Sequence, residues 1–164
     1  LRDAAFGLGE LKRAGFSAQA LKDVGISLMD LKSSGFGALA LRRAGFSLQE
    51  LKDSGFSAQK LKDAGFSVQV LKDAGFSAQK LKDTFSATEL RDGGFGLTEL
   101  KGAGFSLMTL KSSGAGASAL KHAGFSLQEL KDAAFSVQVL KDAGFRVQEL
   151  NAAGFSLTEL RDAG

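Results

Sequence analysis

Residues 61–67 read Leu-Lys-Asp-Ala-Gly-Phe-Ser, and this stretch recurs along the chain as part of a ten-residue unit. The full unit, counted from Leu1, is Leu-Lys-Asp-Ala-Gly-Phe-Ser-x-Gln-x, and we number its Leu as position 1. Sixteen units follow one another, a partial seventeenth begins at Leu160, and all 14 Phe fall at position 6. Self-similarity at a fixed period is the signature of a repeat architecture. We therefore expect residues 1–164 to form one repeat array, irregular at 84–85 and 112–119, and to be a segment of a longer array.

Composition excludes several classes of protein. The 164 residues include no Cys, Pro, Trp or Tyr and a single His, and the net charge is +3. Without Cys there is no disulfide, thiol nucleophile or Cys-based metal site. The apolar runs are only a few residues long, so the sequence predicts no membrane span.

Each unit carries the start and stop signals of one short helix. Ser47-Leu48-Gln49-Glu50 has the spacing of a capping box, in which Ser accepts from a backbone amide and Glu reaches back to the Ser amide. Gly65 stands where a left-handed residue ends a helix, so Phe66 can contact Leu61 in a Schellman turn. We expect each helix to run from position 8 to about position 4 of the next unit, with Phe locking both helix ends.

A helix of two turns is not stable alone, so the units must stack on one another. The sequence thus predicts an all-α solenoid of about sixteen short helices. Position 8 alternates between large and small residues from Leu8 to Ala78, which favours two layers. At Thr84-Phe85 the turn Gly is deleted, and we expect a bend there. Ala115 stands in place of Phe and marks a predicted weak point.

A right-handed β-helix of the pentapeptide type is the alternative fold, because the ten-residue unit is twice the five-residue period of pentapeptide-repeat proteins. That fold needs small residues two places before each central Leu or Phe. Gln69, Gln79 and Gln128 stand there before Leu and would point into a narrow apolar interior. The helix-favouring content of Lys, Glu and Gln also argues for the solenoid.

The motif Leu-Lys-Asp-Ala-Gly-Phe-Ser at 61–67 resembles short-period α-solenoid proteins with LKxAGFS-type decapeptide repeats, which look like distant analogues of tetratricopeptide and HEAT stacks. The resemblance covers the whole chain. It implies an interaction scaffold, implies no enzymatic activity, and transfers no site residues.

The sequence offers little material for catalysis. The Ser hydroxyls are expected to cap helices, and His122 has no second His or Cys with which to build a metal or nucleophile site. We therefore expect no enzyme and no catalytic, cofactor or metal-binding residues.

Two sets of residues are candidate contacts with partners. The first is a basic row at position 2 with two adjoining arginines, which could meet an anionic partner or could instead bind helix-end carbonyls and the neighbouring Asp row. The second consists of apolar residues at normally polar positions. The basic candidates are Lys12, Arg13, Lys22, Lys32, Arg42, Arg43 and Lys52, and the apolar candidates are Met29, Leu39 and Met108.

These features predict a structural scaffold or linker that mediates protein–protein interaction within a larger assembly. One alternative is a self-associating structural filament. Another is a protein that binds polyanions or nucleic acid through the basic row, although no Trp or Tyr is present to stack on bases. The expected partners are other proteins or copies of the chain. The basic row adds acidic protein segments and polyanions as candidate partners.

Overall fold

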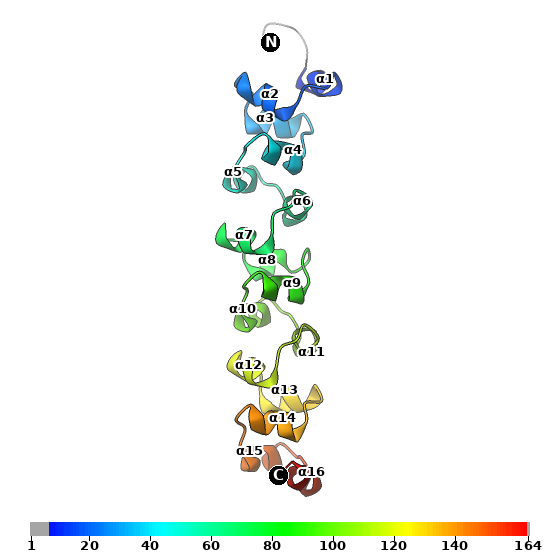
Figure 1. The fold of residues 1–164 in the computed structure, drawn as a ribbon, viewed down its shortest axis with the longest axis vertical. Coiled ribbons are helices and arrows are strands. Elements are labelled where there is room, and N and C mark those ends of the chain that lie inside the picture. The colour runs from blue at the N-terminus through cyan, green and yellow to red at the C-terminus, as the bar shows by residue number, and fades with distance from the viewer. Residues whose placement is uncertain (1–6, 164) are drawn as a thin grey trace. The chain divides into compact units, whose positions relative to one another are not determined.

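The chain is a succession of short α-helices joined by tight turns. The computed structural model describes residues 7–163, in which sixteen helices and no strand are found (Figure 1). The predicted all-α fold is therefore confirmed, and the β-helix alternative is wrong. The helices are α1 (Leu8–Arg13), α2 (Ala18–Asp23), α3 (Leu28–Ser33), α4 (Ala38–Arg43), α5 (Leu48–Asp53), α6 (Ala58–Asp63), α7 (Val68–Asp73), α8 (Ala78–Leu81), α9 (Ala87–Asp92), α10 (Leu97–Gly102), α11 (Leu107–Ser112), α12 (Ala117–His122), α13 (Leu127–Asp132), α14 (Val137–Asp142), α15 (Val147–Ala152) and α16 (Leu157–Asp162).

The turns between helices have the predicted capping chemistry. After α6, the Gly65 amide donates to the Lys62 carbonyl at 2.8 Å, and the Phe66 amide donates to the Leu61 carbonyl at 3.1 Å. These are the two hydrogen bonds of a Schellman motif, and Gly65 has the required positive φ of 81°. Ser67 then caps α7 by accepting from the Val70 amide. Apart from α8, the helices end at position 3, one residue earlier than predicted, and position 4 is the C-cap.

Leucine at position 1 forms the core. From Leu21 through Leu130 these side chains are at most 1% exposed. Phe at position 6 and small residues at position 4 cover them; for example, Phe46 and Ala44 are both buried. Full burial of a Leu side chain stabilises a fold by roughly 1.5–3 kcal/mol, so each Leu of this row contributes strongly to the stability of the stack.

The packing divides the chain into two compact units, Leu1–Phe76 and Ser77–Gly164. Within the first unit, α2, α4 and α6 pack closely on one another, although another helix separates each pair along the chain. Their first residue is Ala, whereas Leu stands there in α1, α3 and α5. In the second unit α8 packs on α10 and α9 on α11. Packing between helices two apart is the structural counterpart of the alternation at position 8.

The deletion at residues 84–85 remakes one turn. Helix α8 has only four residues, and the Phe85 amide donates to the Leu81 carbonyl at 2.9 Å, four residues back instead of five. The backbone of this turn therefore differs from that of the other turns. The expected bend of the helix axes stays a prediction.

The irregularity at 112–119 is confined to side chains. The Ala115 amide donates to the Leu110 carbonyl at 3.0 Å, as the Phe amides do in other turns. Gly116 caps α12 without a side-chain hydrogen bond. The backbone of this unit is therefore regular, although its aromatic ring and its cap hydroxyl are missing.

Candidate functional site

The basic side chain at position 2 reaches the turn that follows the helix after next. The ammonium Nζ of Lys22, in α2, donates to the carbonyls of Ala44 at 2.9 Å and Gly45 at 3.0 Å. It also lies 4.3 Å from the centre of the Phe46 ring. Both carbonyls belong to the C-terminal end of α4. We call this contact, from position 2 to positions 4–6 of a later unit, the clip.

The clip recurs in both units of the chain. The side-chain nitrogens of ten further position-2 residues donate to single or paired backbone carbonyls at 2.5–3.3 Å, and Arg91 binds Ser113 in the same way. The clip pairs are Lys12 with Gly35, Lys32 with Ser54, Arg42 with Ala64, Lys52 with Ala74, Lys82 with Ala103, Lys101 with Gly124, Lys111 with Ala133, Lys121 with Ala143, Lys131 with Ala153 and Lys141 with Ala163.

The physical basis of the clip is the unsatisfied C-terminal end of each helix. Its last carbonyls lack intrahelical partners and carry the negative end of the helix dipole, so a cation there is stabilising. The Phe ring adds a cation–π contact, seen at 4.1 Å for Lys121 over Phe145 and at 5.4 Å for Lys12 over Phe36. The clip therefore joins helices two apart with polar bonds above the Leu core.

The basic candidates from the sequence divide into two groups. Lys12, Lys22, Lys32, Arg42 and Lys52 all form clips, so their donors are engaged by backbone carbonyls. The carbonyl interpretation of this row is thus observed, but the acceptors lie two helices further on. Arg13 and Arg43 lie outside the row: Arg13 donates from Nε to the Gly9 carbonyl at 3.3 Å, and Arg43 is exposed.

The Asp row at position 3 has a different partner from the one expected. Gln at position 9 of the same helix donates to it, as from Gln49 to Asp53 at 2.7 Å and from Gln128 to Asp132 at 2.8 Å. Positions 9 and 3 are four residues apart and therefore neighbours on one strip of the helix surface. We call this the 9/3 strip.

The three apolar candidates all lie on the 9/3 strip and are exposed. Met29 and Met108 are each 56% exposed, and Leu39 is 41% exposed. Position 9 belongs to the polar arc of the helix, which accounts for their exposure.

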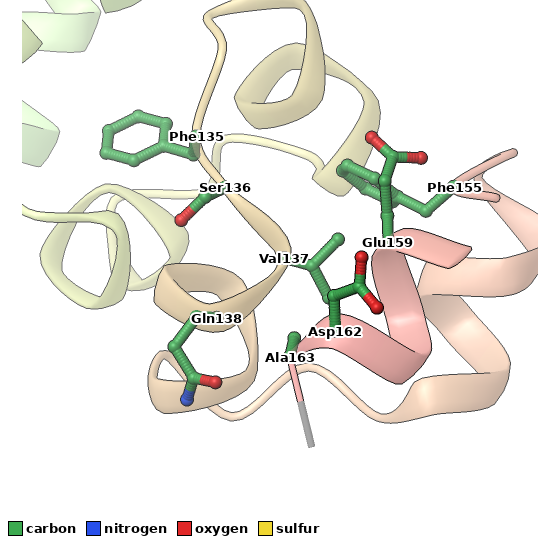
Figure 2. A pocket seen from close by; sticks show the side chains of 8 residues that line it. All are labelled: Phe135, Ser136, Val137, Gln138, Phe155, Glu159, Asp162 and Ala163. Atoms are coloured by element: carbon green, nitrogen blue, oxygen red, sulfur yellow. The ribbon is translucent and has the colours of Figure 1, made fainter. Parts of the chain in front are cut away.

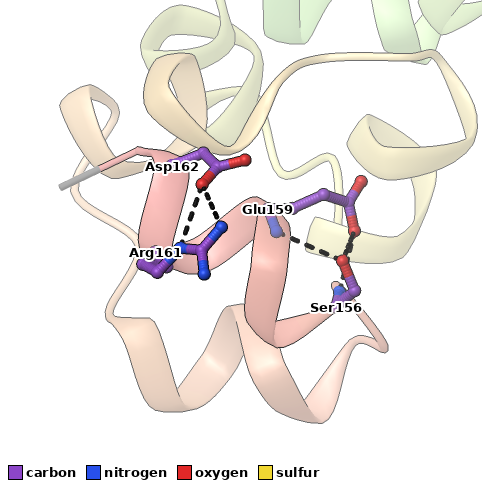
Figure 3. Close-up of polar contacts among 4 residues, drawn as sticks. All are labelled: Ser156, Glu159, Arg161 and Asp162. Carbon is purple, nitrogen blue, oxygen red and sulfur yellow. Dashed lines mark hydrogen bonds and ion pairs between the residues drawn. The ribbon is translucent and has the colours of Figure 1, made fainter.

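The capping carboxylates are the groups with perturbed acidity. Hydrogen bonds from the Ser47 hydroxyl and amide lower the pKa of Glu50. The same capping-box contacts lower the pKa of Glu129 and of Glu159. Figure 3 shows this arrangement at Ser156 and Glu159, with Arg161 bonded to the adjacent Asp162 at 3.0 Å. These shifts serve helix capping and involve exposed groups.

Two grooves lie between helices two apart in the second unit. One separates the start of α14 from α16, with Val137 and Phe155 facing it and the carboxylates of Glu159 and Asp162 on its α16 side (Figure 2). The other lies between α10 and α12 and is lined by Leu97, Thr98, Gly116, Ser118, Ala119, His122 and Ala123. His122 is exposed, and its Nδ1 lies 2.7 Å from the Ser118 carbonyl.

Metal ligands do not cluster in the part of the chain that the structure describes: no group of three or more His, Cys, Asp or Glu residues there could hold an ion. Among the same residues no helix has the length and apolar character needed to cross a membrane.

Stacked short helices, capped at every turn and clipped to the helix after next, define an α-helical repeat protein. The family model for the decapeptide repeat region matches residues 27–96, 67–136 and 104–164, so the chain belongs to the decapeptide repeat family. Comparison with curated proteins gave no significant match, and comparison with solved structures gave none either.

Proposed function

We propose that this repeat protein is a non-enzymatic scaffold or linker that binds other proteins within a larger assembly. The observation that carries the proposal is the placement of Met29, Leu39 and Met108. These side chains are exposed on the 9/3 strip, where other helices carry a hydrogen-bonded Gln–Asp pair. Exposed apolar side chains on a regular stack favour contact with a partner surface.

The side chains that could take part in catalysis have structural roles instead. The Ser47 and Ser126 hydroxyls accept from helix amides and donate to the capping Glu carboxylates. His122 contacts a carbonyl of its own helix. These engagements support a binding role over a catalytic one.

The clip also bears on the polyanion alternative. A lysine whose ammonium group binds two carbonyls and faces an aromatic ring has fewer donors for phosphate or sulfate groups. The engagement of Lys12 through Lys52 in clips favours a protein partner over a polyanion that would need the whole row.

Two measurements test the scaffold proposal. Crosslinking in the native source, followed by mass spectrometry, should place a defined partner protein on the 9/3 strips. Sedimentation of the purified chain over a wide concentration range should give one constant mass. A mass that grows with concentration, with crosslinks only between copies, would favour the filament alternative. Recovery of the chain without any crosslinked protein would contradict the scaffold.

A further inference from the structure

The two longest segments of the chain without an acidic residue carry basic residues. Residues 31–49 contain no Asp or Glu but carry Lys32, Arg42 and Arg43. Residues 100–128 also contain no Asp or Glu and carry Lys101, Lys111 and Lys121, together with the only His. These segments hold six of the 21 basic residues and none of the 18 acidic ones, so the rest of the chain has a net charge of −3.

The two segments belong to two copies of one longer sequence. Residues 28–57 and 107–136 differ at only seven of 30 positions. They share features that are rare elsewhere in the repeat, including a Ser-Ser-Gly turn and Gly in place of the capping Ser. The chain has two Met residues, and they are the second residue of each copy. The similarity therefore exceeds what the ten-residue pattern alone produces.

The two copies present equivalent surfaces, one in each compact unit. In α3 and α11 the 9/3 strip carries Met29 and Met108, exposed to the same extent of 56%. In α4 and α12 the Gln–Asp pair of that strip is replaced as well, by Leu39 with Arg43 in the first copy and by Ser118 with His122 in the second.

Most residues that differ between the copies keep the character of the surface, although the exposed Asp30 of the first copy is Thr109 in the second. Arg42 and Lys121 both form clips, at the ends of α6 and α14. The cations held at the ends of α4 and α12 are those of Lys22 and Lys101. In the second copy the small side chains of Ser118 and Ala119 leave the groove between α10 and α12 open beside His122. Each surface thus combines an exposed thioether, basic groups and a strip without carboxylates.

We propose that α3–α4 and α11–α12 are two copies of one docking surface for an acidic segment of a partner protein, anchored by an apolar side chain. We call them the first and second docking surfaces, with Met29 and Arg43 in the first and Met108 and His122 in the second. The proposal rests on the scaffold function and names its class of partner. Charge complementarity selects an acidic occupant, and the unbranched Met side chain adapts to an apolar anchor.

A protein segment fits these surfaces better than nucleic acid does. Each surface pairs its cations with an exposed apolar group, which a phosphate backbone cannot use. Stacking of bases needs accessible aromatic groups, and the rings that belong to these surfaces, Phe36, Phe46 and Phe125, are buried. Two equivalent surfaces on one chain also allow a partner with two acidic segments to bind with avidity.

The repeat itself supplies variants that erase the docking surfaces and keep the fold. Met29→Gln and Met108→Gln restore the residue that position 9 has in α5 and α6, and Arg43→Asp and His122→Asp restore the Asp of position 3. None of these four side chains forms a clip or belongs to the Leu core. We call the chain that carries all four substitutions the fourfold variant. Circular dichroism should show that its helix content is unchanged.

The probe is a labelled synthetic peptide of Glu residues with Leu at every fourth position, compared with the same peptide carrying Gly in place of Leu. Fluorescence anisotropy at low salt should show two peptides bound per chain. A variant that carries the two substitutions of only one surface should bind one peptide. The fourfold variant should bind the peptide at least tenfold more weakly than the native chain does. The Gly peptide should bind at least fivefold more weakly than the Leu peptide.

Matched controls separate docking from net charge. Lys60→Glu makes the same change of charge as Arg43→Asp, and Val70→Gln removes an exposed apolar group outside both surfaces. Both should bind the peptide within twofold of the native chain. If these controls weaken binding as much as the fourfold substitutions do, the docking proposal is wrong. Equal binding of the Leu and Gly peptides would also contradict it. Stronger binding of a single-stranded oligonucleotide than of the Leu peptide would overturn it as well.

The fourfold variant also distinguishes this inference from the scaffold function. If the variant keeps its crosslinked native partner, the scaffold stands and the docking surfaces are wrong. If the native chain has no crosslinked partner at all, the scaffold function itself fails.

Discussion

Ala134 has the left-handed conformation that Gly provides in the neighbouring turns, with φ of 56°. An L-residue with a Cβ is strained there by roughly 1–2 kcal/mol. We predict that Ala134→Gly stabilises the second unit by about 0.5–1 kcal/mol, after allowance for the greater backbone freedom of Gly in the unfolded chain. Chemical denaturation measures the change. The control is Ala133→Gly, one residue earlier at φ −78°, which should destabilise instead; stabilisation by both would contradict the strain argument.

The clip is the residue-scale contact that sequence reasoning located only in part. Binding to helix-end carbonyls was one of two interpretations of position 2, and local rules describe only neighbouring turns. Lys22 binds a turn 22–23 residues away, and that distance depends on how successive helices stack. The Schellman turns and Ser caps were predictable because each involves residues three to five apart. Gln49 and Asp53 are four residues apart on one helix, so helix spacing alone can account for their pairing.

The strength of the clip is testable at Lys22. We predict that Lys22→Gln weakens the turn after α4 by about 1–2 kcal/mol, because a charged hydrogen bond and a cation–π contact are lost from a half-exposed site. Native-state hydrogen exchange of the Gly45 and Phe46 amides measures the loss. Lys22→Arg should restore most of it, since Arg42 makes the same contacts. Lys60→Gln, on the exposed polar arc, is the matched control and should leave exchange unchanged.

At the scale of the element, each helix depends on its own cap. The capping hydrogen bonds lower the pKa of Glu50, so the ionised form stabilises the start of α5. This contribution is complete above the ordinary Glu pKa of about 4.3 and is lost as the pH falls below that value through the lowered pKa.

We therefore predict that α5 frays at its N-terminus between about pH 5 and pH 3, whereas α6, with Lys60 in the place of Glu50, does not. Amide chemical shifts of the two helices in one titration provide the measurement. Glu50→Gln should remove the difference between them. Equal pH responses of α5 and α6 in the native chain would show that the capping box is not the cause.

The unit with Ala115 in place of Phe allows a second test at the scale of the element. Ala115 keeps the backbone hydrogen bond of the turn but provides no ring above Leu110 and Leu120. In a packed core, Phe-to-Ala changes remove roughly 3–5 kcal/mol. We predict faster hydrogen exchange for residues 110–120 than for 60–70. Ala115→Phe should slow it, because the first copy holds Phe36 at this place, with Lys12 over the ring. Equal protection in the native chain would refute the weak point.

At the scale of the whole molecule, the packing of the helices depends on the ten-residue period of the sequence. The Leu core needs a Leu every ten residues, and the clip needs a turn two helices ahead. Loss of one residue at 84–85 was absorbed within a turn, and Lys82 still reaches Ala103 at 3.2 Å. Repeat proteins of this kind gain stability from each unit and its neighbours, without contacts between distant parts.

The chain itself contains a natural test of this rule, because its two long copies continue differently. In the first copy α5 is followed by α6 and then α7, whereas α13 is followed directly by α14, whose sequence matches that of α7. A whole unit is thus missing from the second copy, and Lys111 and Lys121 still form their clips.

We predict that deletion of residues 57–66 leaves a folded chain. Lys32 keeps its clip after α5, and Arg42 finds Ala74 and Phe76 in the places that Ala64 and Phe66 held. Helix content per residue should remain unchanged by circular dichroism, and stability should change only by the increment of one unit. Deletion of residues 57–61 is the control: it places Phe66 where Leu61 belongs and removes a helix start, so it should abolish cooperative unfolding of the first unit. If the ten-residue deletion were as damaging as the five-residue one, stability would depend on the identity of the units and not on their period.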